Sequence, residues 1–76
     1  MNKARRKAIQ DINERIEDIK GEIEAIMEEE QEAFDNMPEG IQASERGEAC
    51  EAAVSSMEDA INGIEEAMSS MEEAQA

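Results

Sequence analysis

The side chains that could do chemistry in this chain are almost all carboxylates. Its 76 residues include 21 Asp and Glu, seven Lys and Arg, one Cys, and no His, Tyr or Trp. Cys50 and the serines therefore lack a histidine that could activate them as nucleophiles. Paired carboxylates do acid–base work where a cleft shifts their pKa values, and a slender helical chain offers no such cleft. We expect no enzyme activity, no catalytic residue and no cofactor.

Metal binding and thiol chemistry find little support in the spacing of the residues. The glutamates at 28–30 and the pair Glu65 and Glu66 could hold calcium or magnesium only loosely. No segment has the spaced Asp and Asn ligands, turn glycine and final glutamate of a dedicated calcium loop. Cys50 falls on a predicted core position, where a thiol behaves as a small hydrophobic side chain. We expect neither a metal site nor a reactive thiol.

Isoleucines at alternating intervals of three and four residues predict a first helix over residues 3–36. They occupy positions a and d of a heptad repeat, the pattern of a coiled coil, and are Ile9, Ile12, Ile16, Ile19, Ile23 and Ile26. A break follows at 37–43, because Pro38 cannot continue a helix and Gly40 permits a reversal. Ser44 is the expected N-cap of a second helix that ends near residue 75.

The second helix repeats one heptad three times, with apolar residues at a and d. Those at a are Val54, Ile61 and Met68, and those at d are Cys50, Met57, Ile64 and Met71. Position g carries a small residue in each heptad, and position c carries Ser or Gly. These small residues widen the apolar stripe and leave an open flank that includes Ala53, Ala60, Gly63 and Ala67.

A short connection makes the two helices antiparallel neighbours, so the predicted fold is an all-α, two-helix coiled-coil hairpin over residues 1–76. The residue numbers of facing pairs should add to about 83 (from ~1.5 Å rise per residue), which places Ile19 by Ile64, Ile26 by Met57 and Ala33 by Cys50. A hairpin of this size has a thin core and no disulfide. We therefore expect a homodimer that closes over the alanine flank as a four-helix bundle.

The charge distribution bears on the partner and the compartment. The net charge is −14, and from residue 8 onward three basic side chains stand against 21 acidic ones, or −18. Such a surface repels nucleic acid and anionic membranes, so we expect a protein partner with a basic surface. The basic cluster Lys3, Arg5, Arg6 and Lys7 should pair with glutamates at the other end of the chain. A lone thiol, without a secretory or membrane-spanning segment, predicts a cytoplasmic protein.

Three groups of residues are candidates for partner binding. Near the turn, Met27 and Phe34 lie at successive e positions, off the predicted seam, with Met37 and Ile41 close by. These four residues form an apolar patch, for which capping the bundle or packing on a second copy is favoured over anchoring a foreign partner. The second group is the alanine flank. The third is acidic: Glu58, Glu65 and Glu66.

Residues 30–42, EQEAFDNMPEGIQ, together with SER at 44–46 and the Glu-x-Ala heptads that follow, resemble a group of small proteins. These are uncharacterised acidic helical proteins of Firmicutes phages and mobile elements, and the resemblance covers about residues 27–74. It implies a phage or mobile-element origin, hence a bacterial cytoplasm, and no known activity. We therefore expect a non-catalytic protein–protein interaction protein. The most specific version of this expectation is an acidic inhibitor that mimics nucleic acid and so blocks a nucleic-acid-binding host or defence protein. The alternative is a structural coiled-coil assembly module.

Overall fold

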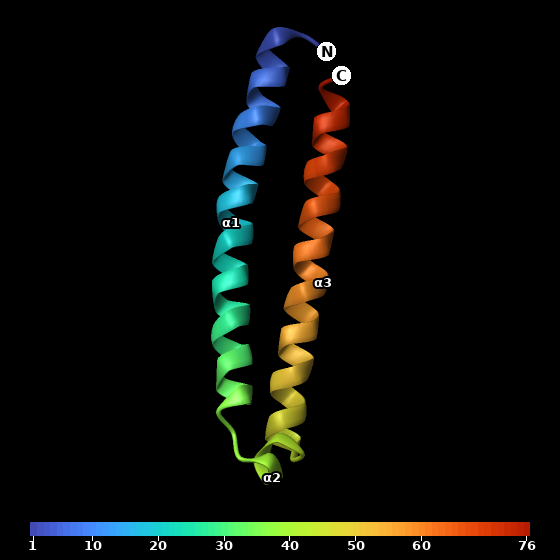
Figure 1. The fold of residues 1–76 in the computed structure, drawn as a ribbon. Helices are drawn as coiled ribbons and strands as arrows, with labels where there is room; N and C mark the ends of the chain where they lie inside the picture. Colours follow the sequence, from blue (N-terminus) through green and yellow to red (C-terminus); the bar gives the residue numbers. More distant parts are fainter.

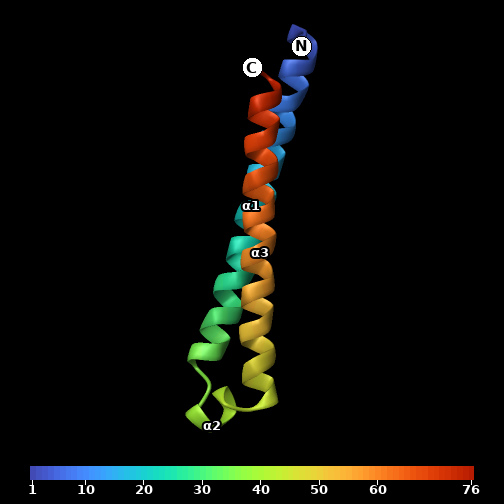
Figure 2. The same cartoon turned by 90° about the vertical axis from the view of Figure 1, so that its right-hand side faces the viewer.

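The computed structural model describes residues 1–76 and contains only helices. These are α1 (Lys3–Asp35), α2 (Glu39–Gln42) and α3 (Glu45–Ala74). Figure 1 shows α1 and α3 lying side by side and antiparallel, with both termini at one end and the short α2 at the other. Figure 2 shows the two long helices crossing at a shallow angle. The result is a rod of 58 × 15 × 12 Å, and the all-helical class predicted from the sequence is confirmed.

Local sequence explains where the helices begin and end. Asn2 caps α1, because its side-chain oxygen accepts a hydrogen bond of 2.8 Å from the Arg5 amide. Pro38 has no N–H to donate and adopts an extended conformation (φ −58°, ψ 150°), which ends the first helix. Its carbonyl then accepts hydrogen bonds from the amides of Ile41 and Gln42. The predicted turn at 37–43 thus contains one helical turn, α2.

The turn is held against α3 by a direct backbone contact at Gly47. Gly47 is buried, and a Cβ placed on it would overlap the carbonyl group of Gln42. The Gln42 side-chain amide donates a 3.0 Å hydrogen bond to the carbonyl of Phe34, which ties α2 to the end of α1. Ser44 is the N-cap residue of α3 by position, but its hydroxyl donates back to the Ile41 carbonyl. The expected capping bond from Ser44 is therefore not made.

The axial register of the hairpin agrees with the sequence prediction. Side chains of α1 contact α3 at three levels: Gln10 with Gln75, Asn13 with the Met68 carbonyl, and Lys20 with Glu65. The residue numbers in these pairs add to between 81 and 85, which brackets the expected value of about 83. Helix α3 also presents its predicted a and d residues to the seam, and all of them are buried or half-buried.

The rotation of α1 about its own axis differs from the prediction. Ile19 and Ile26, expected in the seam, are 49% and 56% exposed. Apart from Ile12 at position d, the buried and half-buried side chains of this helix lie at positions a and e, and those at e are Asn13, Lys20, Met27 and Phe34. A seam at positions a and e, in place of a and d, corresponds to a rotation of the helix about its axis by about 50°, at ~100° per residue. The prediction that Ile19 and Ile26 are buried in the seam is therefore wrong.

At the turn end of α1, this rotation increases the apolar area in the seam. In the a/d arrangement the last two heptads of α1 would bury Ile26 and Ala33, whereas in the a/e arrangement they bury Met27 and Phe34. The second pair offers more apolar surface, and each Å² removed from water is worth about 25 cal/mol. Ala33 is accordingly exposed. The hairpin half-buries Met27 and Phe34 near the turn and leaves two isoleucines largely exposed.

Candidate protein-binding surface

An ion pair marks one side of the hairpin as polar. The Lys20 ammonium lies 3.2 Å from a Glu65 carboxylate oxygen and 3.9 Å from one of Glu17. A hydrogen bond to Glu65, followed by the charge of Glu17, raises the pKa of Lys20 above its usual value of 10.5. Lys20 and Glu65 occupy position e of their respective helices, so this contact bridges the e side of the seam at the middle of the hairpin.

The opposite side of the hairpin is apolar and open. In an antiparallel pair, positions reached by turning in the same sense from the seam lie on the same side. Position d of α1 therefore shares a side with position g of α3, across from the Lys20–Glu65 pair. We call this surface the isoleucine face, and its residues are Ile12, Ile19 and Ile26 of α1 with Ala53, Ala60 and Ala67 of α3. Ile12 and Ala53 are half-buried, and the other four residues are exposed.

Sequence reasoning placed only part of this surface. The alanine flank was identified: Ala60, Ala67 and the adjoining Gly63 are exposed. Ile19 and Ile26 were assigned to the core and missed. The available signal was the pair of large apolar residues at successive e positions, Met27 and Phe34, which compete with position d for the seam.

The apolar patch expected at the turn is divided by the structure. Met27, Phe34 and Met37 are half-buried within the hairpin. Of this group only Ile41 is exposed, with 39% of its surface accessible to solvent. These four residues therefore do not form one continuous exposed patch.

The acidic candidates are exposed but differ in their contacts. Glu58, Glu65 and Glu66 all face solvent, and Glu65 is the one paired with Lys20. Charge is also uneven along the rod. Residues 1–22 and 62–76, the terminal half, carry six basic and nine acidic side chains, a net of −3, whereas residues 23–61, the turn half, carry one and twelve, a net of −11.

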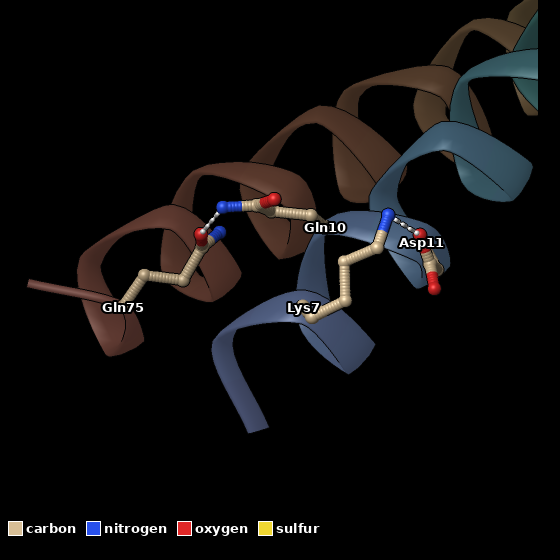
Figure 3. Close-up of polar contacts among 4 residues, drawn as sticks. All are labelled: Lys7, Gln10, Asp11 and Gln75. Carbon is tan, nitrogen blue, oxygen red and sulfur yellow. Dashed lines mark hydrogen bonds and ion pairs between the residues drawn. The ribbon is translucent and has the colours of Figure 1, made fainter. Parts of the chain in front are cut away.

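The basic cluster at the start of α1 does not pair with the glutamates of α3, contrary to expectation. Lys7 instead contacts Asp11, one turn further along its own helix, at 3.0 Å (Figure 3). A hydrogen bond to Asp11 raises the pKa of Lys7. Figure 3 also shows the contact that does join the two chain ends, a 3.1 Å hydrogen bond from the Gln10 amide to Gln75. Lys3, Arg5 and Arg6 form no ion pair.

Cys50 lies in the seam as predicted, beside Glu30. Ala33, which was expected to face it, is exposed. The thiol is buried. A hydrogen bond to Glu30, then burial, and then the charge of Glu30 raise the pKa of Cys50 above its usual value of 9.0. Each of these causes disfavours the thiolate, which is the reactive form of cysteine.

No pocket opens on the surface, and no group of three His, Cys, Asp or Glu side chains gathers to hold a metal ion. None of the helices combines the length and apolar character needed to cross a membrane. What the structure offers a ligand is an extended face, not a cavity. Comparison with protein-family models, curated proteins and solved structures finds no match to this chain.

Proposed function

We propose that this chain is a non-catalytic protein that acts by binding another protein through the isoleucine face. The supporting observation is the exposure of Ile19 and Ile26, at 49% and 56%. Covering such side chains is favourable by about 25 cal/mol per Å² of apolar area. The hairpin alone leaves about half of the surface of each of these two isoleucines uncovered. An α-helical partner with its own apolar stripe would cover it.

One form of this function is structural association. Only four residues of the hairpin are buried, and none is completely so. A second pair of helices on the isoleucine face would complete a four-helix bundle, in which two faces of each helix are packed. The small residues Ala60, Gly63 and Ala67 would let another backbone come close. The exposed isoleucines favour this form.

The alternative form, which would use the charges of the turn half in place of the isoleucine face, is an acidic inhibitor of a nucleic-acid-binding host or defence protein, in a bacterial cytoplasm. The turn half supports it, because −11 over about half of the 58 Å rod is one charge per ~2.6 Å, against one per ~1.7 Å of duplex DNA. The whole rod, at −14 over 58 Å, reaches only about one charge per 4 Å. A basic partner would therefore dock on the turn half. The resemblance of residues 27–74 to phage proteins is consistent with this form.

Sedimentation equilibrium at micromolar concentration, in low and in high salt, separates the two forms. Association through the isoleucine face persists in high salt, whereas binding to a basic protein through exposed charges weakens steeply. The double variant Ile19→Gln/Ile26→Gln should become monomeric and keep its helical spectrum, since both side chains are exposed in the hairpin. Glu14→Gln/Asp59→Asn, on the outer faces, is the matched control and should behave as wild type. If Ile19→Gln/Ile26→Gln associates and binds proteins as the wild type does, the proposed function is wrong.

A further inference from the structure

We infer that the isoleucine face is covered by a second copy of this chain, docked antiparallel, with Arg15 of each copy beside Glu22 of the other. This inference rests on the proposed function and names the partner. It uses three observations: the direction of the exposed stripe, the unequal charge of the two halves of the rod, and the unpaired state of Arg15.

The exposed stripe has the direction that a four-helix bundle requires. The centre of the α1 seam lies between positions a and e, and position d lies about 80° away from it around the helix, at ~100° per residue. Neighbours in a four-helix bundle are contacted through two faces roughly at right angles. In such a bundle all six heptad isoleucines are packed: those at position a lie within the hairpin, and those at position d lie between the two copies. The sequence keeps isoleucine at both positions, although the hairpin alone needs only one of them.

The charge distribution selects the orientation of the second copy. In a parallel dimer the two turn halves, each with a net charge of −11, would lie together. In an antiparallel dimer each turn half lies beside a terminal half with a net charge of −3. The terminal half also carries Lys3, Arg5 and Arg6, which have no ion pair within the chain. Both halves are negative, but the repulsion between −11 and −3 is weaker than that between −11 and −11, so the antiparallel arrangement is favoured over the parallel one.

The stripe also sets the position of the two-fold axis. It consists of Ile12, which is half-buried, and the exposed Ile19 and Ile26. The three are centred on Ile19, so two antiparallel stripes overlap fully when Ile19 meets its own copy and Ile12 meets Ile26. Position g flanks position d on the outer side, and g meets g across an antiparallel contact. This register brings Arg15 to Glu22 of the second copy, twice per dimer. Both residues are exposed, and neither has an ion pair within the hairpin.

Cross-linking with a short bismaleimide tests the register directly. In a Cys50→Ala background, Ile19→Cys places the two thiols of a dimer beside the two-fold axis, and we expect efficient dimer cross-linking. Ile26→Cys is the matched control, because its two copies would lie 14 residues apart along the helix axis, about 21 Å. Absence of cross-linking at position 19, or equal cross-linking at both positions, overturns the inferred register.

Exchanging the charges of Arg15 and Glu22 tests the antiparallel orientation of the two copies. These variants keep the native Cys50. Arg15→Glu should weaken the dimer by about tenfold, since two attractive contacts become repulsive. The double variant Arg15→Glu/Glu22→Arg, which keeps the wild-type net charge, should restore the affinity. Equal affinity of the wild type and Arg15→Glu overturns the pairing. A monomeric wild type overturns the second-copy inference. In that case the proposed function still holds if the wild type binds a foreign protein that Ile19→Gln/Ile26→Gln does not bind, and fails if both bind it equally.

Discussion

Lys20 and Glu65 face one another across the seam at 3.2 Å, each from position e of its heptad. This contact links two features of the hairpin. It places a polar pair on one side of the seam, and it belongs to the rotation of α1 that turns Ile19 and Ile26 outward on the other side. The polar side is satisfied within a single chain, whereas the apolar side is not.

The rotation of α1 predicts unequal effects of truncation at two adjacent residues. Met27→Ala should lower the free energy of unfolding by about 1–2 kcal/mol, because a half-buried seam side chain is lost. Ile26→Ala should change it by less than about 0.5 kcal/mol, as expected at an exposed position. Denaturant unfolding followed by circular dichroism, at a concentration where the chain is monomeric, measures both. The reverse order would restore the a/d seam.

Gly47 should be intolerant of a side chain, unlike Gly21. A methyl group on Gly47 would overlap the Gln42 carbonyl, so Gly47→Ala should separate α2 from α3 and lower the melting temperature. Nothing lies within 4 Å of a Cβ at Gly21. Gly21→Ala should therefore stabilise the helix by up to about 1 kcal/mol. Equal shifts in the two thermal melts would argue against a close contact between α2 and α3.

Asn13 should limit the stability of the seam. Its amide donates a 3.3 Å hydrogen bond to the Met68 carbonyl, but its side-chain oxygen is buried without a partner. An unsatisfied buried polar atom costs about 1–3 kcal/mol. Asn13→Leu should therefore raise the free energy of unfolding by about 1 kcal/mol or more, while Asn62→Leu, at an exposed position, leaves it nearly unchanged. A clear loss of stability in Asn13→Leu would show that the polar pair contributes more than its unsatisfied oxygen costs.

Stability should fall in alkaline solution because of Cys50. Its pKa in the folded chain is raised by the hydrogen bond to Glu30, by burial and by the charge of Glu30. The stabilising contribution of the protonated thiol is present below the unfolded pKa, near 9.0, and is lost as the pH rises through the folded pKa. Urea unfolding at pH 7 and pH 10 should show a larger loss for wild type than for Cys50→Ala. Glu30→Gln should increase the rate of thiol alkylation at pH 8, and an unchanged rate would rule out Glu30 as the cause.

The sequence predicted the helices, the antiparallel register and the α3 seam because Pro38, Gly40 and the heptads of α3 each favour one solution. It did not predict the rotation of α1, because both the a/d and the a/e arrangements bury isoleucine at position a. The choice depends on how all the side chains at d and e, Met27 and Phe34 among them, pack against α3, which is a tertiary quantity. The role of Gly47 was equally hidden, since the α2 backbone that contacts it follows from the path of the turn.

The most direct measurement of the central claim is the solvent exposure of individual isoleucine methyl groups by NMR with a soluble paramagnetic agent. At a concentration where the chain is monomeric, the methyl signals of Ile19 and Ile26 should broaden strongly, while those of Ile9 and Ile61, which are buried, stay sharp. As the chain associates, Ile19 and Ile26 should become protected and Ile41 should remain exposed. If Ile19 and Ile26 are as protected as Ile61 in the monomer, or stay exposed in the associated state, the isoleucine face is not the binding surface.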